Sequence, residues 1–233
     1  LIEGKHPAQR ALIKEELVAH MLCAGILKNE LEGRSGPVMD KISNSEEKFT
    51  SSLEFNLTGA QKRTWDEIRS DLTGNLPMRR LLQGDVGSGK TLVGALSALH
   101  AHENGWQTAF MCPTEILAEQ HHLSLSEWFS SLGLRVELLT GSTNASDRKE
   151  IISKLKSGEI NILVGTHALF QEDVIFNCLG LTVIDEQHRF GVHQRFSMLE
   201  KGGTKNQSPH QLIMTATPIP RTLAMTVYGS LET

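Results

Sequence analysis

The stretch QGDVGSGKT at residues 83–91 contains the residue types that most directly indicate chemistry. It fits the pattern G-x-x-x-x-G-K-[ST], in which glycines let successive backbone N–H groups face one anion. Lys90 can reach the β- and γ-phosphates of a nucleotide, and the Thr91 hydroxyl can bind Mg²⁺. An apolar run precedes the loop and a helical pattern follows it, as a phosphate loop requires. The predicted nucleotide-binding residues here are Gly84, Asp85, Val86, Gly87, Ser88, Gly89, Lys90 and Thr91.

A pair of acids, Asp185 and Glu186, ends the apolar run LTVIDE at 181–186. A carboxylate at the carboxyl end of a parallel strand lies on the edge where such sheets bind ligands. Asp185 would hold the Mg²⁺, directly or through water, and Glu186 would orient and deprotonate the attacking water. The alternative is an ordinary solvated acidic pair at the start of a loop. The phosphate loop elsewhere in the chain favours the metal site.

Short apolar runs alternate with helical patterns along most of the chain. The predicted strands are 79–84, 106–112, 134–141, 160–166, 181–186 and 210–217. Several are apolar on both faces, which is typical of strands buried in a parallel sheet. The predicted helices are 89–103, 114–131, 144–157 and a shorter one near 193–200. This alternation predicts an α/β fold with a doubly wound parallel sheet.

The first 52 residues differ in composition from the rest of the chain. Apolar residues recur at helical spacing over 8–31, so residues 1–33 are predicted to form a helical lead-in segment. Residues 34–52 are rich in serine and poor in large apolar side chains, which predicts a flexible linker. We therefore expect a nucleotide-binding domain over 53–233, with an N-terminal helical extension.

Composition excludes several kinds of site. The net charge of −4 excludes a global basic field, so any nucleic acid must be bound by local patches and backbone amides. The three cysteines lie far apart without a CxxC pair, which argues against a disulfide framework or a zinc knuckle. No apolar run approaches the roughly 20 residues of a membrane span. His100, His102, His121 and His122 lack a convincing third metal ligand, so surface or capping positions are predicted for them.

Several motifs, in order along the chain, resemble those of superfamily 2 helicases of the RecG type. They are LTGAQ at 57–61 with Phe55 upstream, PTEILAEQH at 113–121, GTHALFQ at 165–171, DEQH at 185–188 and MTATPIPRTLAMTVYG at 214–229. The resemblance covers roughly residues 53–233. It implies a RecA-like P-loop lobe that uses ATP and Mg²⁺.

The resemblance also implies roles for individual residues. Gln61 would read the adenine, with Thr58 and Phe55 near the base, while Lys90, Asp185 and Glu186 would serve hydrolysis. Coupling of the nucleotide state to DNA would fall to His188, Thr215 and Thr217. The nucleic-acid path would be lined by Pro113, Thr114, Gly141, Thr166 and Arg221. A helix N-cap is the plainer interpretation of Thr114 and Thr166, and both roles can coexist.

The implied activity is ATP-driven translocation on, and remodelling of, branched DNA in repair and recombination. The alternatives are a related duplex-DNA translocase, of the transcription-repair coupling or primosomal type, and a nucleotide-dependent scaffold without turnover. The chain begins at Leu1 without a methionine, so we expect a fragment. The family's second RecA-like lobe, with its arginine fingers, and its wedge domain would then be partners, and the fragment alone nearly inactive. The family's default compartment is the bacterial cytoplasm, with a plastid or mitochondrion as the alternative and no membrane partner.

Overall fold

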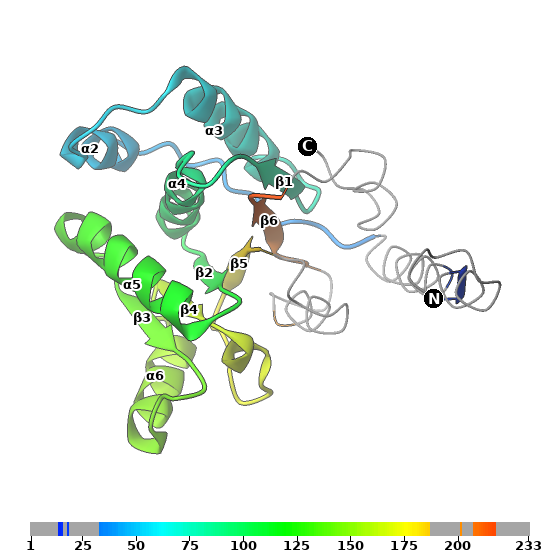
Figure 1. The fold of residues 1–233 in the computed structure, drawn as a ribbon, viewed down its shortest axis with the longest axis vertical. Coiled ribbons are helices and arrows are strands. Elements are labelled where there is room, and N and C mark those ends of the chain that lie inside the picture. The colour runs from blue at the N-terminus through cyan, green and yellow to red at the C-terminus, as the bar shows by residue number, and fades with distance from the viewer. Residues whose placement is uncertain (1–13, 16–17, 19–32, 187–200, 202–206, 218–233) are drawn as a thin grey trace, which may run out of the picture.

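A computed structural model describes residues 14–15, 18, 33–186, 201 and 207–217 of the chain (Figure 1). The predicted helix near 193–200 lies outside these residues, and so does almost all of the predicted helix at 8–31. Among the residues described, no helix is long and apolar enough to cross a membrane.

Six parallel strands form one sheet in the order β1-β6-β5-β2-β4-β3. Their bounds are Arg79–Gln83 for β1, Gln107–Met111 for β2, Val136–Leu139 for β3, Ile162–Gly165 for β4, Leu179–Asp185 for β5 and His210–Thr215 for β6. All six predicted strands are confirmed with nearly the predicted bounds. Parallel pairing places all their carboxyl ends along one edge of the sheet.

Three helices that connect the strands are also confirmed: α4 at Lys90–Glu103, α5 at Glu115–Phe129 and α6 at Ala145–Ser157. The Thr114 side chain caps α5 by accepting the backbone N–H of Leu117, and Asn144 caps α6 in the same way. Short 3₁₀ turns occupy Ser130–Leu132 and His167–Phe170.

Helix α3, at Gly59–Leu72, is absent from the sequence prediction. It begins with a capping box in which Thr58 and Gln61 each accept the other's backbone N–H. The helix buries Trp65, Ile68 and Leu72. The spacing of Thr58 and Gln61 was therefore an available signal for a helix start.

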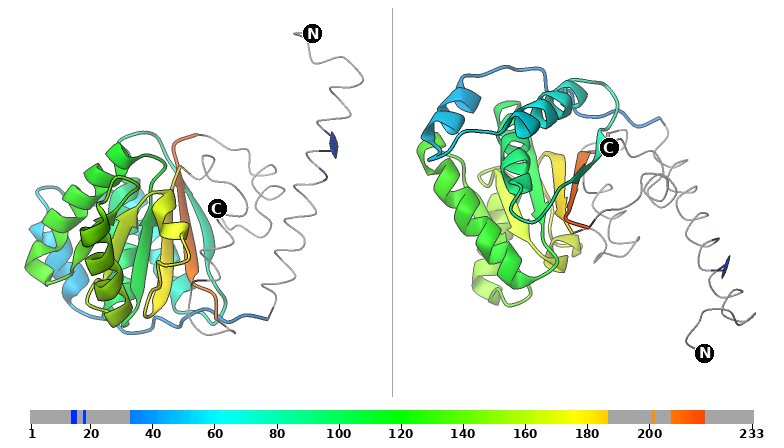
Figure 2. Two further views of the ribbon diagram at one scale, coloured as in Figure 1. Left: turned by 90° about the horizontal axis from the view of Figure 1, so that it is seen from below. Right: turned by 45° about the horizontal axis from the view of Figure 1, so that its top comes forward.

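The helices cover the two faces of the sheet, as a doubly wound fold requires. Helices α3, α4 and α5 pack on one face around a core that includes Leu96, Phe110 and Val183. Helix α6 packs on the other face, around a core that includes Met111, Leu155 and Ile184. Figures 1 and 2 show α5 and α6 on opposite sides of β3. Neighbouring β-strand residues thus enter different cores, which explains why the strands are apolar on both faces.

The prediction that residues 34–52 form a flexible linker is wrong. Residues Ser45–Ser52 form helix α2, and both Met39 and Phe49 are fully buried in the core shared with α3, α4 and α5. The backbone N–H of Met39 donates to the Leu72 carbonyl at 3.0 Å. These two large apolar side chains, together with the hydrogen bond from the Trp65 indole N–H to Glu46 of α2 at 2.7 Å, attach the segment to the lobe, although its average composition is polar.

Candidate functional site

The predicted phosphate loop follows β1, and the neighbouring strands β6 and β5 provide the Thr215–Thr217 segment and the acidic pair. The backbone N–H of Gly84 donates to the Thr215 carbonyl at 3.2 Å, which joins the ends of β1 and β6. The backbone N–H of Glu186 donates to the Met214 carbonyl at 2.9 Å, which joins β5 to β6. The predicted phosphate and metal residues therefore share one stretch of the sheet edge.

The phosphate loop has the conformation that its glycines allow. Gly87 and Gly89 have φ of 80° and 81°, in the left-handed region that disfavours other residues. A side chain at Gly89 would also collide with the Gln61 amide. The Lys90 ammonium donates to the carbonyls of Gly84 and Asp85, at 2.6 and 2.9 Å. Because α4 begins at Lys90, its N-terminal N–H groups face the loop and favour an anion.

On the other side of the loop lie the residues predicted to contact the base. The Gln61 amide donates to the Ser88 carbonyl at 2.9 Å, and its oxygen accepts the backbone N–H of Thr58 at 2.8 Å. The start of α3 is therefore fastened to the phosphate loop. Phe55 is 51% exposed, so its ring is available to a base. Adenine recognition by these residues stays a prediction.

Glu186 is held tightly between β5 and β6. Its carboxylate accepts the backbone N–H of Ala216 at 2.9 Å and the Thr215 hydroxyl at 3.2 Å. Glu186 is also the one described residue other than glycine with positive φ, at 51°. A glutamate in this region costs roughly 1 kcal/mol or more, and its hydrogen bonds offset that cost. The Thr215 and Thr217 hydroxyls lie 2.9 Å apart, so Thr217 is connected to Glu186 through Thr215.

Asp185 contacts a residue that the sequence prediction placed elsewhere. His121 of α5 lies with Nε2 2.9 Å from Asp185 Oδ2, and the two side chains are only 12% and 14% exposed. Surface or capping positions were predicted for the histidines, which is wrong for His121 and also for His100, whose buried ring contacts the Met39 carbonyl. Only folding brings His121 to Asp185, so sequence spacing offered no signal for this contact.

The donor set suits Mg²⁺ bound together with a nucleotide. Thr91 and Asp185 offer hard oxygen atoms, which Mg²⁺ prefers. The described residues contain no group of three His, Cys, Asp or Glu side chains that could hold a metal alone. Mg²⁺ is commonly held by one or two protein oxygens plus phosphates and water, which matches this arrangement. Beside Asp185, burial raises the pKa of the Cys112 thiol, as does the negative charge of Asp185, so Cys112 stays neutral.

The other three strands end in the residues predicted to line a nucleic-acid path. Pro113 and Thr114 follow β2, Thr166 follows β4 and Gly141 follows β3. Thr114 is exposed and also caps α5, so its capping role is confirmed and its nucleic-acid role stays a prediction. The Thr166 hydroxyl is buried and makes no capping bond, and no hydrogen-bond partner for it occurs in the described part of the chain.

Glu115 connects two of these loops, although the sequence analysis did not single it out. Its carboxylate accepts the Ser142 backbone N–H at 3.2 Å and the Ser142 hydroxyl at 2.9 Å. Gly141 beside it is exposed, and a side chain there would press on Glu115. The start of α5 and the end of β3 are therefore joined. The remaining predicted residues, His188 and Arg221, lie outside the described residues.

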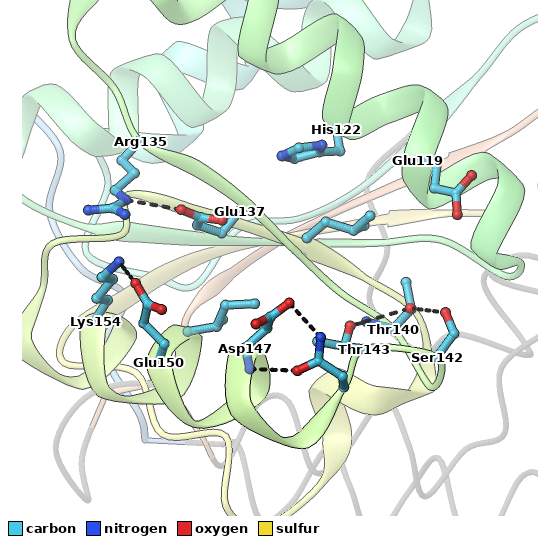
Figure 3. Close-up of a pocket in the computed structure, with 13 residues that line it drawn as sticks. Glu119, His122, Arg135, Glu137, Thr140, Ser142, Thr143, Asp147, Glu150 and Lys154 are labelled. Carbon is cyan, nitrogen blue, oxygen red and sulfur yellow. Dashed lines mark hydrogen bonds and ion pairs between the residues drawn. The ribbon is translucent and has the colours of Figure 1, made fainter.

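A polar groove of about 500 Å³ lies beside the edge strand β3, between α5 and α6 (Figure 3). His122 and Glu119 line it from α5, and Figure 3 shows Glu137, Glu150 and Asp147 each engaged with a neighbouring side chain. Arg135 pairs with Glu137, and Lys154 pairs with Glu150. The groove shares neither the phosphate loop nor the acidic pair, so it is separate from the nucleotide site.

The fold and this edge define a RecA-like P-loop lobe. The profile of the DEAD/DEAH box helicases matches residues 58–226, more than half of the chain. The chain belongs to the DEAD/DEAH box helicase family.

Two curated relatives confirm the resemblance to RecG helicases. The chain is 52% identical over 233 residues to "ATP-dependent DNA helicase RecG" of Pasteurella multocida, covering 100% of this chain and 34% of the relative. It is 51% identical over 230 residues to the protein of the same name from Escherichia coli K12, covering 99% and 33%. The chain thus spans about a third of the length of these relatives.

Solved structures agree with the sequence matches. The chain matches "Structure of RecG bound to three-way DNA junction" with a TM-score of 0.77 and 47% identity, covering 92% of this chain and 28% of that chain. It matches the helicase MrfA bound to DNA with a TM-score of 0.62 and 19% identity, covering 86% and 30%. The second match supports the fold alone.

Proposed function

We propose that this chain is the ATP-binding lobe of a RecG-type DNA helicase, which couples ATP hydrolysis to translocation on, and remodelling of, branched DNA in repair and recombination. The observation that carries the proposal is the division of one sheet edge. Strand β1 ends in the predicted phosphate loop, β6 in the predicted coupling threonines and β5 in the acidic pair, whereas β2 and β3 end beside the exposed Thr114 and Gly141 and β4 ends at the buried Thr166. The relatives named as RecG helicases support the DNA substrate.

In this proposal each residue of the nucleotide site has a separate task. The loop amides and Lys90 hold the phosphates, and Lys90 exchanges its two carbonyl partners for phosphate oxygens. Thr91 and Asp185 would hold Mg²⁺, which would neutralise phosphate charge. Glu186 orients a water and takes its proton. Because the Thr215 hydroxyl donates to the Glu186 carboxylate, a change in the charge or position of Glu186 alters the hydrogen bonding of the coupling segment.

The proposal extends to the rest of the machine. The chain spans about a third of its relatives, so we expect a second RecA-like lobe to complete the ATP site and a wedge domain to engage the junction. Residues 1–233 alone should bind Mg·ATP weakly and hydrolyse it negligibly, because an arginine finger is worth about 10³–10⁵ in turnover. The bacterial origin of the relatives supports a bacterial cytoplasm as the compartment.

The test is the ATPase rate of the full-length helicase that contains this chain, at one fixed salt concentration. Forked DNA, a four-way junction, plain duplex, single strands and RNA would be compared. Stimulation mainly by forks and junctions is expected. Equal stimulation by plain duplex would indicate a duplex-DNA translocase instead. Lys90→Ala is the control: an enzyme loses its rate, whereas a scaffold without turnover shows no stimulated rate to lose.

A further inference from the structure

Helix α5 is the element that crosses from one half of the sheet edge to the other. It starts after β2 at Thr114, among the loops proposed to contact DNA. Seven residues later its His121 reaches Asp185 at the end of β5, in the nucleotide half. At a rise of about 1.5 Å per residue, the two positions lie about 10 Å apart along one rigid helix.

The contact is partly buried, and an aromatic ring also packs against the imidazole. His121 Nε2 lies 2.9 Å from Asp185 Oδ2, and its ring packs on Phe110 with centroids 4.9 Å apart. Among the described residues, His121 is the one side chain that hydrogen-bonds to Asp185. An ionised carboxylate only accepts hydrogen bonds, so the imidazole donates from Nε2. The geometry leaves Oδ1 of Asp185 as the oxygen not engaged by the imidazole.

The start of the same helix is tied to a second loop of the DNA half. Glu115 accepts both the backbone N–H and the hydroxyl of Ser142, next to Gly141. A shift of that loop is therefore transmitted to the first turn of α5. Because α5 is a continuous hydrogen-bonded helix, its first turn and His121 move together.

We propose that His121 is a positioning residue for the metal site. It fixes the orientation of the Asp185 carboxylate and joins it to α5, so that DNA bound at the start of α5 changes how tightly Mg²⁺ is held with the nucleotide. The role assigned to Asp185 rests on the proposed function above. Hydrogen bonds to metal-binding carboxylates commonly change metal affinity by about 10- to 100-fold, so the expected effect is large enough to measure.

The first experiment measures binding, not turnover. A fluorescent ATP analogue is bound to residues 1–233 while Mg²⁺ is titrated, and the Mg²⁺ concentration at half-saturation is compared among variants. His121→Ala should raise that concentration roughly tenfold. His121→Gln keeps a side-chain N–H donor and should recover most of the loss. His122→Ala is the matched control, because the neighbouring histidine contacts the Val136 carbonyl at the separate groove.

The second experiment uses the full-length helicase with forked DNA. His121→Ala should lower DNA-stimulated kcat more than it raises the KM for ATP, and excess Mg²⁺ should restore part of the rate. The melting temperature of each variant identifies any loss that is only structural.

The outcomes separate the two proposals. If His121→Ala matches His122→Ala in Mg²⁺ half-saturation, or if His121→Gln rescues nothing, the positioning role is overturned. If the Mg²⁺ concentration shifts but the DNA stimulation factor does not, the link to DNA is overturned. An unsubstituted helicase that ignores all DNA would contradict the proposed function, while the binding comparison would still decide the role of His121.

Discussion

The two halves of the sheet edge are built differently. In the half proposed to bind the nucleotide, the loop ends are fastened to one another: Gly84 to Thr215, Glu186 to Ala216 and Thr215, and Gln61 to Ser88. In the half proposed to face DNA, Thr114 and Gly141 are exposed, and the side-chain links described there include Glu115 to Ser142 and Arg148 to Asp173.

The difference follows from what each half must do. Chemistry on a phosphate needs groups held within a fraction of an ångström, so the nucleotide half must be preorganised. A protein that slides along DNA must contact any sequence, and backbone N–H groups and hydroxyls on a phosphate backbone suffice for that. The first requirement fixes residue types strongly, whereas the second fixes them weakly.

The largest effect should come from the nucleotide half. Glu186→Gln keeps the size of the side chain and removes the proposed base, so the DNA-stimulated kcat of the full-length helicase should fall by roughly 10²–10⁴. DNA affinity, measured in the same protein, should stay within about threefold of the original, because Glu186 lies outside the half proposed to face DNA. Glu119→Gln, on the exposed face of α5 at the separate groove, is the control and should change neither. A Glu186→Gln variant that loses DNA binding as severely as turnover would contradict the division of the edge.

A substitution in the core should destabilise the whole lobe, and with it both halves of the sheet edge. Phe49 of α2 packs on Phe129 of α5, with ring centroids 5.4 Å apart, and is fully buried. Phe49→Ala should lower the free energy of unfolding by about 3–5 kcal/mol. Urea unfolding of residues 1–233 measures this free energy. Ile42→Ala, at a position 89% exposed, should change it by less than about 0.5 kcal/mol. Equal stabilities for the two variants would show that residues 34–52 do not support the lobe in solution.

The same contrast explains what the sequence could predict. The six strands and helices α4, α5 and α6 follow from hydrophobic pattern, and the phosphate loop and acidic pair from dense local motifs. Helix α2 escaped prediction because its segment is polar on average and is attached by two buried apolar side chains, Phe49 and Met39, and by contacts of Glu46 with α3 that only the fold creates. His121 escaped because its partner lies 64 residues away in sequence and meets it only through the strand order β5-β2. Motifs report on local chemistry, and contacts between elements need the topology.

A smaller effect is expected in the DNA half. Thr114→Val removes the cap of α5 and the exposed hydroxyl, so the DNA concentration for half-maximal ATPase should rise roughly 3- to 10-fold with kcat nearly unchanged. Stability should fall by about 1 kcal/mol from the lost cap. Thr114→Ser keeps both functions and should behave like the original protein. If Thr114→Val lowers kcat and leaves the DNA requirement unchanged, Thr114 acts on the nucleotide half instead.

The smallest effect is a pH dependence at the opposite edge of the sheet. His210, at the start of β6, accepts the backbone N–H of Met78 at 2.9 Å and contacts the Pro37 carbonyl at 2.7 Å. Burial lowers the pKa of His210, an effect that the Pro37 carbonyl and Asp71 oppose and that His100 reinforces. The folded protein therefore keeps His210 neutral at a pH where the unfolded chain, with a pKa of about 6.5, takes up a proton.

The sign of the pH effect follows directly. The stability that neutral His210 contributes is complete above about pH 6.5 and is lost as the pH falls below that value. The free energy of unfolding of residues 1–233 should thus decline from pH 7.5 to 5.5, and less steeply in His210→Gln, which cannot titrate. Strand β6 also carries Thr215 at its other end. If stability declines while the Mg²⁺ concentration for half-saturation of nucleotide binding is unchanged at pH 6.5, the two ends of this strand act independently. Parallel pH profiles in the two proteins would instead mean that His210 is charged or solvated in the folded lobe.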